Sequence, residues 1–147
     1  MSRERAIAHA ERYFDDGGFF ADLARRVAIP TESQNPERAA DLARYLTEEM
    51  QPSFERLGFK CRVFENPLPK GGPFLLAERI EDPSFVTVLS YGHGDVIRGQ
   101  DKSWKAGLDP WKLTRDGERL YGRGTADNKG QHSINLAAAA AAIEARG

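Results

Sequence analysis

Residues 85–96 read FVTVLSYGHGDV, and this stretch decides both the fold class and the position of a candidate site. Its first half, residues 85–90, is an almost continuous apolar run, which is typical of a central strand buried on both faces. Its second half places His93 and Asp95 just beyond the end of that predicted strand. In open α/β sheets, ligands bind at the carboxyl ends of the strands. We therefore expect these two side chains to lie in a binding site.

The sequence on either side of this stretch alternates between helical and extended patterns. Apolar spacing predicts helices over residues 3–15 and 19–28, and a third helix begins at Asn35-Pro36 with a capping side chain and a proline at its first position. Pro52 is expected to kink or break this third helix. The later elements are predicted as strands over 60–65 and 74–80, a hairpin around Asp116-Gly117, and a helix over 129–146 with alanines at 137–142. This order favours an α/β fold in which helices pack on a mixed β-sheet, within a single domain.

The composition excludes several classes of protein. The 147 residues include 21 Lys and Arg against 22 Asp and Glu, so the net charge is −1 and nucleic acid is not an expected partner. Cys61 is the only cysteine, which excludes an intrachain disulfide. No apolar run approaches the ~20 residues that span a bilayer, so we expect no membrane association. The charged N-terminal residues do not resemble a secretion signal, and cytoplasmic localisation is the expectation.

The chemistry of His93 and Asp95 is compatible with a metal site. A neutral imidazole is a good zinc ligand, and a ligand histidine usually donates its other ring N–H to a carboxylate or carbonyl. Asp95, two residues later, is a natural candidate for that orienting role. The alternative is a buried histidine that is hydrogen-bonded to a neighbour, and a bare His-x-Asp pattern favours this alternative.

A second candidate ligand, Asp127, follows the glycine-rich loop 122–126 and directly precedes the last predicted helix. A carboxylate can bridge two metal ions about 3.5–4 Å apart. The alternative is a helix N-cap with no metal, which is a common role for aspartate.

Taken together, these motifs resemble a known family. The motifs GHGDV at 92–96, Trp104, DPW at 109–111 and LYGRGTADNKGQ at 120–131 occur in the order found in the co-catalytic zinc peptidase and deacylase family. That family includes acetylornithine deacetylase, succinyl-diaminopimelate desuccinylase, carboxypeptidases and carnosine-type dipeptidases. The segment Ile29-Pro30-Thr31 also lies where the family often has Ile-Pro-Ser. The resemblance implies a catalytic domain with the phosphorylase/hydrolase-like fold of the zinc exopeptidases.

The resemblance also implies a role for each residue. His93 would ligate one zinc ion, Asp127 would bridge two, and Asp95 would be the active-site aspartate that orients His93. The peptide bond between Asp127 and Asn128 would be cis. The substrate would be a small peptide or an N-acyl amino acid, with Co²⁺ or Mn²⁺ as possible replacements for the two Zn²⁺.

Several parts of the family pattern are not found in these 147 residues. The family needs a downstream acidic pair, a further acidic ligand and a late histidine, whereas Glu144 is the only acid after Asp127. We therefore expect residues 1–147 to be the N-terminal portion of the catalytic domain, without the lid and dimerisation domain through which the parent enzyme would form a homodimer. The isolated chain is expected to be inactive. The alternative is a non-catalytic fragment, or a structural or association module that binds no metal.

Overall fold

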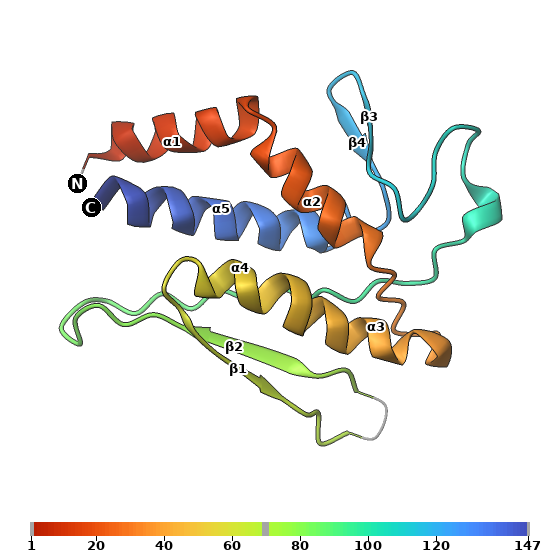
Figure 1. Cartoon of the computed structure of the whole chain (residues 1–147), viewed down its shortest axis with the longest axis horizontal. Coiled ribbons are helices and arrows are strands. Elements are labelled where there is room, and N and C mark those ends of the chain that lie inside the picture. Colours follow the sequence, from red (N-terminus) through yellow and green to blue (C-terminus); the bar gives the residue numbers. More distant parts are fainter. Residues whose placement is uncertain (1, 69–70, 147) are drawn as a thin grey trace.

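The computed structural model describes residues 2–68 and 71–146, and it contains a layer of helices, a β-hairpin on one side of it and a long loop region (Figure 1). The helices are α1 (Arg3–Asp15), α2 (Gly18–Ala28), η1 (Pro36–Arg38), α3 (Ala39–Arg44), η2 (Tyr45–Met50), α4 (Gln51–Glu55), η3 (Asp101–Ser103) and α5 (Lys129–Arg146). The strands are β1 (Lys60–Phe64), β2 (Phe74–Glu78), β3 (Thr114–Asp116) and β4 (Arg119–Tyr121). The prediction of an α/β fold is confirmed. Within the described residues, no helix is both long and apolar enough to span a membrane.

The helix boundaries follow the local chemistry of the sequence. Ser2 begins α1 by accepting a hydrogen bond from the Arg5 N–H, and Gly17, with φ of 81°, allows the sharp turn into α2. The predicted cap at Asn35 is present, because its side chain accepts from the Glu37 N–H at 3.2 Å and Pro36 follows it. These signals explain why the predicted helix starts agree with the structure.

Pro52 was predicted to kink or break the third helical segment, and the structure shows no break there. The segment continues from Ala39 to Glu55, but it widens into a π turn over Tyr45–Met50, where the Gln51 N–H bonds to the Leu46 carbonyl. A proline has no N–H to donate and its ring crowds the carbonyl four residues earlier. A wider turn before Pro52 relieves that conflict, which is a known response to proline within a helix.

The strands form two separate antiparallel pairs in the described residues. β1 pairs with β2 from Lys60 opposite Glu78 to Phe64 opposite Phe74, and β3 pairs with β4 around the predicted Asp116-Gly117 turn. The β1–β2 hairpin lies beside α4, and partly buried Leu75 packs against the helical core.

The prediction that residues 85–90 form a paired central strand is wrong for this structure. The segment is not hydrogen-bonded into either described sheet, and Val86, Val88 and Leu89 are 91%, 85% and 90% exposed. The apolar run indicated a segment that is covered by neighbouring strands, but the described residues contain no strand that pairs with it. For the same reason the alanine-rich α5 packs against the helices α1 and α2, and not on a sheet (Figure 1).

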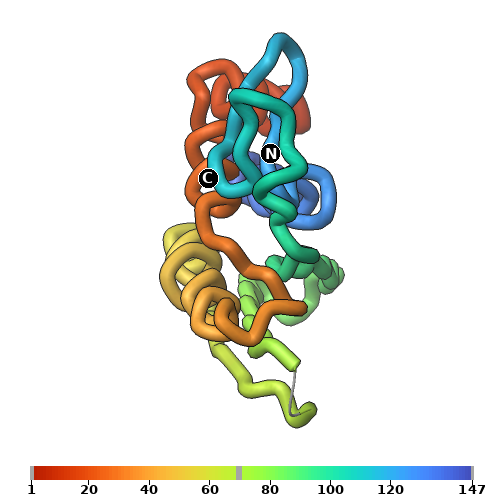
Figure 2. Tube along the Cα trace, turned by 90° about the vertical axis from the view of Figure 1, so that its right-hand side faces the viewer, coloured from red at the N-terminus to blue at the C-terminus, as the bar shows by residue number. Residues whose placement is uncertain are grey.

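Two apolar clusters and one polar cluster hold the helices together. Ile29, Tyr45, Met50 and Leu136 form one apolar cluster, and the other is formed by Leu23, Val27 and Leu113. The side view shows the helices stacked above the β1–β2 hairpin, with the loop region toward the viewer in front of the upper helices (Figure 2). The loop that carries His93 is hydrogen-bonded to the segment that follows α2 and to Asn128 at the start of α5, so the fold places the candidate site beside the helical core.

Candidate metal centre

The loop that carries His93 is held by the segment that follows α2. The Val96 N–H donates to the Thr31 carbonyl at 2.8 Å, and the Ser33 N–H donates to the Val96 carbonyl at 3.1 Å. The buried Thr31 hydroxyl also donates to the Gly94 carbonyl at 2.5 Å. The Ile29-Pro30-Thr31 motif therefore has a structural reason, since a hydroxyl at position 31 fixes the backbone directly after His93.

Asp95 and Asp127 face opposite nitrogens of the His93 ring. The distance from His93 Nδ1 to Asp95 Oδ1 is 3.1 Å, and Nδ1 lies equally close to the Asp95 carbonyl oxygen. On the other side, His93 Nε2 lies 3.0 Å from Asp127 Oδ1. The structure thus brings together all three residues predicted from the sequence.

This geometry is suited to a cation. A neutral imidazole carries one N–H, and if Nδ1 donates to Asp95, the lone pair of Nε2 faces a carboxylate oxygen of Asp127. Two acceptors at 3.0 Å repel each other unless a proton or a metal ion lies between them. His93 and Asp127 therefore fit as part of a metal-binding set, with Asp95 fixing the tautomer that leaves Nε2 available.

The set is small, however. The described residues contain no group of three or more His, Cys, Asp or Glu side chains that converge on one point. Structural zinc takes four protein ligands and catalytic zinc usually takes three. Asp127 is also 84% exposed on its side chain, so the pocket of about 350 Å³ bounded by His93, Asp95, Gly124 and Asp127 opens to solvent.

The start of α5 fixes the position of Asp127. The Asp127–Asn128 peptide bond is cis, as the resemblance implied. Two residues later, fully buried Lys129 donates from Nζ to the carbonyls of Arg26, at 2.9 Å, and Ile29, at 2.6 Å. Burial lowers the pKa of Lys129 to about 7, and the Asp41 carboxylate opposes that shift. These contacts give Lys129 a structural role, because they tie the loop at Asp127 to the end of α2.

The tryptophans and Arg123 organise the long loop between His93 and the β3–β4 hairpin. The Gly99 carbonyl accepts from Trp104 Nε1 at 2.8 Å and from Arg123 at 3.2 Å, and the Arg123 guanidinium lies over the Trp104 ring. Trp111 Nε1 donates to Asp101 at 3.1 Å. These contacts tie the loop over residues 99–111 together and join it to Arg123, which lines the pocket.

Two residues near the site were underestimated from the sequence. Tyr45 is almost fully buried, and its hydroxyl lies 2.5 Å from Nε2 of His132 on α5. Burial lowers the pKa of His132 to about 4, and the cations Arg26 and Lys129 act in the same direction, so the ring is neutral near pH 7. The sequence pattern did not single out Tyr45, and only the tertiary structure brings it to His132.

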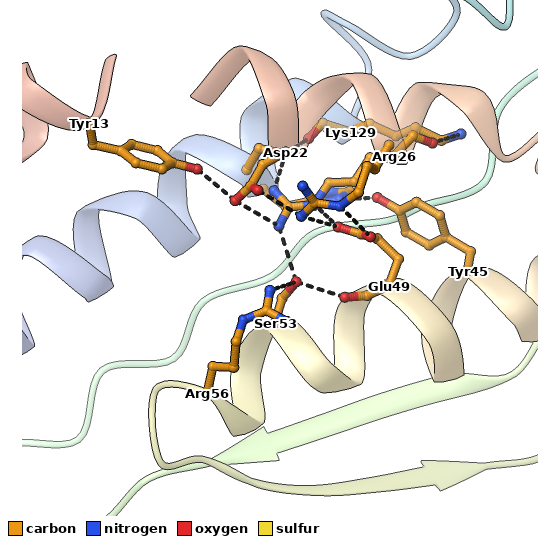
Figure 3. Close-up of polar contacts among 11 residues, drawn as sticks. Tyr13, Asp22, Arg26, Tyr45, Glu49, Ser53, Arg56 and Lys129 are labelled. Carbon is orange, nitrogen blue, oxygen red and sulfur yellow. Dashed lines mark hydrogen bonds and ion pairs between the residues drawn. The ribbon is translucent and has the colours of Figure 1, made fainter. Parts of the chain in front are cut away.

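A buried ionic network lies next to these residues (Figure 3). Arg26, 1% exposed, donates to the Ser133 hydroxyl at 2.6 Å and pairs with Glu49 at 3.3 Å. Asp22 joins the network by accepting from Tyr13 and Arg25, each at 2.6 Å. The network connects α2, η2 and α5, the three elements that surround the His93 loop.

Comparison with known proteins identifies relatives of this chain. Residues 89–147 match the model of peptidase family M20/M25/M40, and this range contains His93, Asp95 and Asp127. Human Beta-Ala-His dipeptidase is 42% identical over 137 residues, which cover 86% of this chain and 26% of that protein. The Cys-Gly metallodipeptidase DUG1 of Candida albicans is 30% identical over 124 residues, which cover 76% of this chain and 25% of the relative.

The fold agrees with these relationships. The crystal structure of human carnosine dipeptidase 1 matches with a TM-score of 0.80 and 31% identity, over 96% of this chain and 31% of that chain. This chain is a relative of the M20/M25/M40 peptidases. The resemblance predicted from its motifs is therefore confirmed.

The relationship to the M20/M25/M40 peptidases extends over only part of those proteins. The chain spans about a quarter of the length of the human and Candida dipeptidases that it matches. Thr31, which fixes the backbone after His93, and Lys129, which ties the loop at Asp127 to the end of α2, lie in the same 147 residues as the two candidate ligands. This part of the family fold therefore includes both the candidate ligands and their supports.

Proposed function

We propose that residues 1–147 form the N-terminal portion of the catalytic domain of a dinuclear zinc-dependent amidohydrolase that cleaves dipeptides. The observation that carries this proposal is the arrangement of His93 between the carboxylates of Asp95 and Asp127, at 3.1 and 3.0 Å. The names of the relatives support a dipeptide substrate, since the human relative is a Beta-Ala-His dipeptidase and the Candida relative a Cys-Gly metallodipeptidase.

Each residue has a distinct task in this proposal. Asp95 holds the proton on Nδ1 of His93, which leaves Nε2 free as a ligand. Asp127 offers two exposed carboxylate oxygens, enough to contact two ions. Bound zinc would polarise the scissile carbonyl and lower the pKa of a water molecule. The general base, the remaining ligands, and the lid and dimerisation domain would come from polypeptide outside residues 1–147.

The isolated chain is expected to hydrolyse neither dipeptides nor N-acyl amino acids, because two ligands and no general base are insufficient. An assay of the purified chain with added Zn²⁺, using β-alanyl-histidine, cysteinyl-glycine and N-acetylornithine, tests this expectation. Hydrolysis that follows the protein through purification would contradict it.

A chimera tests the positive part of the proposal. Residues 1–147 would replace the matched segment of human Beta-Ala-His dipeptidase, to which this chain is 42% identical. We expect the chimera to bind zinc and to hydrolyse β-alanyl-histidine faster than N-acetylornithine. His93→Ala and Asp127→Ala in the chimera should abolish activity, while Asp95→Ala should weaken zinc binding by roughly 10–100-fold.

The matched control is Asp116→Ala, which removes an exposed aspartate in the β3–β4 hairpin. Its activity should equal that of the unmodified chimera. A folded chimera that binds no zinc, or one in which His93→Ala keeps full activity, would overturn the proposed roles. Preference for N-acetylornithine would assign the deacylase branch and not the dipeptidase branch.

A further inference from the structure

The backbone around His93 rests directly on two side chains from distant parts of the sequence. A Cβ atom added to Gly92 would lie 2.6 Å from Cβ of His132, and one added to Gly94 would overlap the Tyr45 ring. Real Cβ atoms do not approach other atoms this closely, so both positions require glycine if the loop is to keep its place. The two glycines that flank His93 therefore allow close contact with Tyr45 and His132 in particular.

A chain of hydrogen bonds runs from Tyr45 to the backbone of His93, and its direction can be derived. The His93 N–H is an obligate donor and lies 3.2 Å from the Asn128 side chain, so the atom that faces it must be the amide oxygen, Oδ1. His132 Nδ1 lies 3.4 Å from the same oxygen and must therefore carry a hydrogen to contribute. In a neutral ring this leaves Nε2 as an acceptor, and the Tyr45 hydroxyl donates to it at 2.5 Å.

Every group in this chain thus has a defined role. Tyr45 donates to His132, His132 donates to Asn128, and Asn128 Oδ1 accepts from both His132 and the His93 backbone. The second half of the Asn128 amide is also fixed, because its nitrogen donates to the Gln131 side chain. The amide cannot turn over without losing these contacts together.

We propose that Tyr45 and His132 are positioning residues for His93, acting through the Asn128 amide and through direct contact with Gly92 and Gly94. They touch neither substrate nor metal in this proposal; they set the location of the His93 backbone, and hence of its ring. The purpose of the arrangement depends on the proposed function, because precise placement matters only if His93 is a ligand.

The buried position of Tyr45 supports a role beyond packing. A buried phenylalanine would fill the same volume with no hydroxyl to satisfy, whereas the Tyr45 hydroxyl needs a partner and finds it in His132. Lys129 Nζ lies 5.1 Å from the centre of the Tyr45 ring, and it also anchors the start of α5. Tyr45 therefore lies against Gly94, directly after the candidate ligand His93, and close to Lys129, shortly after the candidate ligand Asp127.

Nuclear magnetic resonance of the chain itself provides the test, because it requires neither metal nor activity. The chain has three histidines, so the ring nitrogens of His132 can be assigned by comparison with His132→Asn. We expect His132 to be protonated on Nδ1 and unprotonated on Nε2. A ring protonated on Nε2 would overturn the proposal, because its Nδ1 could not donate to Asn128.

Hydrogen exchange at the His93 amide tests the connection to the loop. Asn128→Ala removes the acceptor of the His93 N–H, so its exchange rate at His93 gives the largest acceleration against which the other variants are compared. Tyr45→Phe should accelerate exchange at His93 by about fivefold to tenfold relative to amides in α1, the change expected from weakening one hydrogen bond. The matched control is Thr47→Val, two residues further along the same helix on its exposed side, which should leave His93 exchange unchanged.

A second pair of variants separates positioning from helix packing. His132→Asn keeps a donor near the place of Nδ1, so it should protect the His93 amide better than His132→Ala. If Tyr45→Phe leaves His93 exchange within twofold of the unmodified chain, or if both His132 variants behave alike, the two residues act in packing alone and the proposal is wrong. If the exchange results are as expected but the chimera is inactive, the positioning role stands and the proposed function fails.

Discussion

Charged side chains are usually exposed and apolar side chains buried, but two regions of this chain show the reverse. They are the ionic network between α2, η2 and α5 and the exposed segment 85–90. Arg26 and Lys129, two basic residues, are at most 1% exposed, whereas Val86 and Leu89 are at least 90% exposed. The buried polar groups are stable because each finds partners: Arg26 has Glu49 and Ser133, and Lys129 has two carbonyls. The exposed valine and leucine have no such partners in the described residues. At these four positions burial thus follows the availability of partners and not hydrophobicity.

The largest effect in this comparison should come from Arg26→Met. Removal of the guanidinium leaves Glu49, which is 8% exposed, with the partly exposed Arg25 as its remaining ion-pair partner. Loss of one partner from a buried pair typically costs about 3–5 kcal/mol. Urea unfolding measures this loss, and the control Arg12→Met, at an exposed position of α1, should change the free energy of unfolding by less than about 0.5 kcal/mol.

The double variant Arg26→Met/Glu49→Leu sharpens the interpretation. Replacement of a whole buried pair by apolar side chains is often nearly neutral. We therefore expect the double variant to recover at least about half of the stability lost in Arg26→Met. A double variant that is less stable than the single one would mean that Ser133, Ser53 and Asp22 depend on these charges, and that the polar layer is one cooperative unit.

A smaller effect should appear as pH dependence at Asp22. Burial alone would raise the pKa of the Asp22 carboxyl, but hydrogen bonds from Tyr13 and Arg25 outweigh it and hold the pKa below its ordinary value of 3.8. A lowered pKa in the folded state contributes stability above the unfolded pKa, and this contribution is lost as the pH falls through the folded value. The free energy of unfolding of the unmodified chain should thus fall more steeply below pH 4 than that of Asp22→Asn. Parallel curves for the two proteins between pH 4 and pH 2 would contradict this expectation.

The smallest effect on stability should come from the exposed segment. Val86→Thr/Val88→Thr removes apolar surface that contacts little in the described structure, so the free energy of unfolding should change by less than about 0.5 kcal/mol. The same change should reduce self-association in sedimentation velocity, because exposed apolar strands promote pairing between chains. A stability loss of 2 kcal/mol or more would show that this segment is buried in solution.

Some features of these regions could be predicted from the sequence, and others could not. The helix starts at Ser2 and Asn35 and the hairpin turn at Asp116-Gly117 depend on neighbouring residues, and the structure agrees with the predictions for Asn35 and the hairpin. The convergence of His93, Asp95 and Asp127 could be predicted because the motifs resembled a family with a known arrangement. The exposure of segment 85–90 could not be predicted. An apolar run suggests that a segment is buried, but it does not show which other part of the protein covers it.

The ionic network around Arg26 could not be predicted from the sequence either. Arg26 and Glu49 lie 23 positions apart, and Arg26 and Ser133 lie 107 apart. No local pattern distinguishes these side chains from the exposed charges around them. The same holds for Tyr45 and His132, 87 positions apart, whose hydrogen bond depends on the packing of two helices.

The π turn before Pro52 has a geometric consequence for all of these contacts. In a regular α-helix, residues four apart drift by about 40° around the axis, so Tyr45, Glu49 and Ser53 would spread by about 80°. A π turn holds one more residue, and its drift runs in the opposite sense. Tyr45, Glu49 and Ser53 therefore stay in one row along the helix, and all three are buried. The π turn before Pro52 thus aligns Tyr45, which lies against the His93 loop, with Glu49, which pairs with Arg26, and with Ser53, which accepts a hydrogen bond from Arg26.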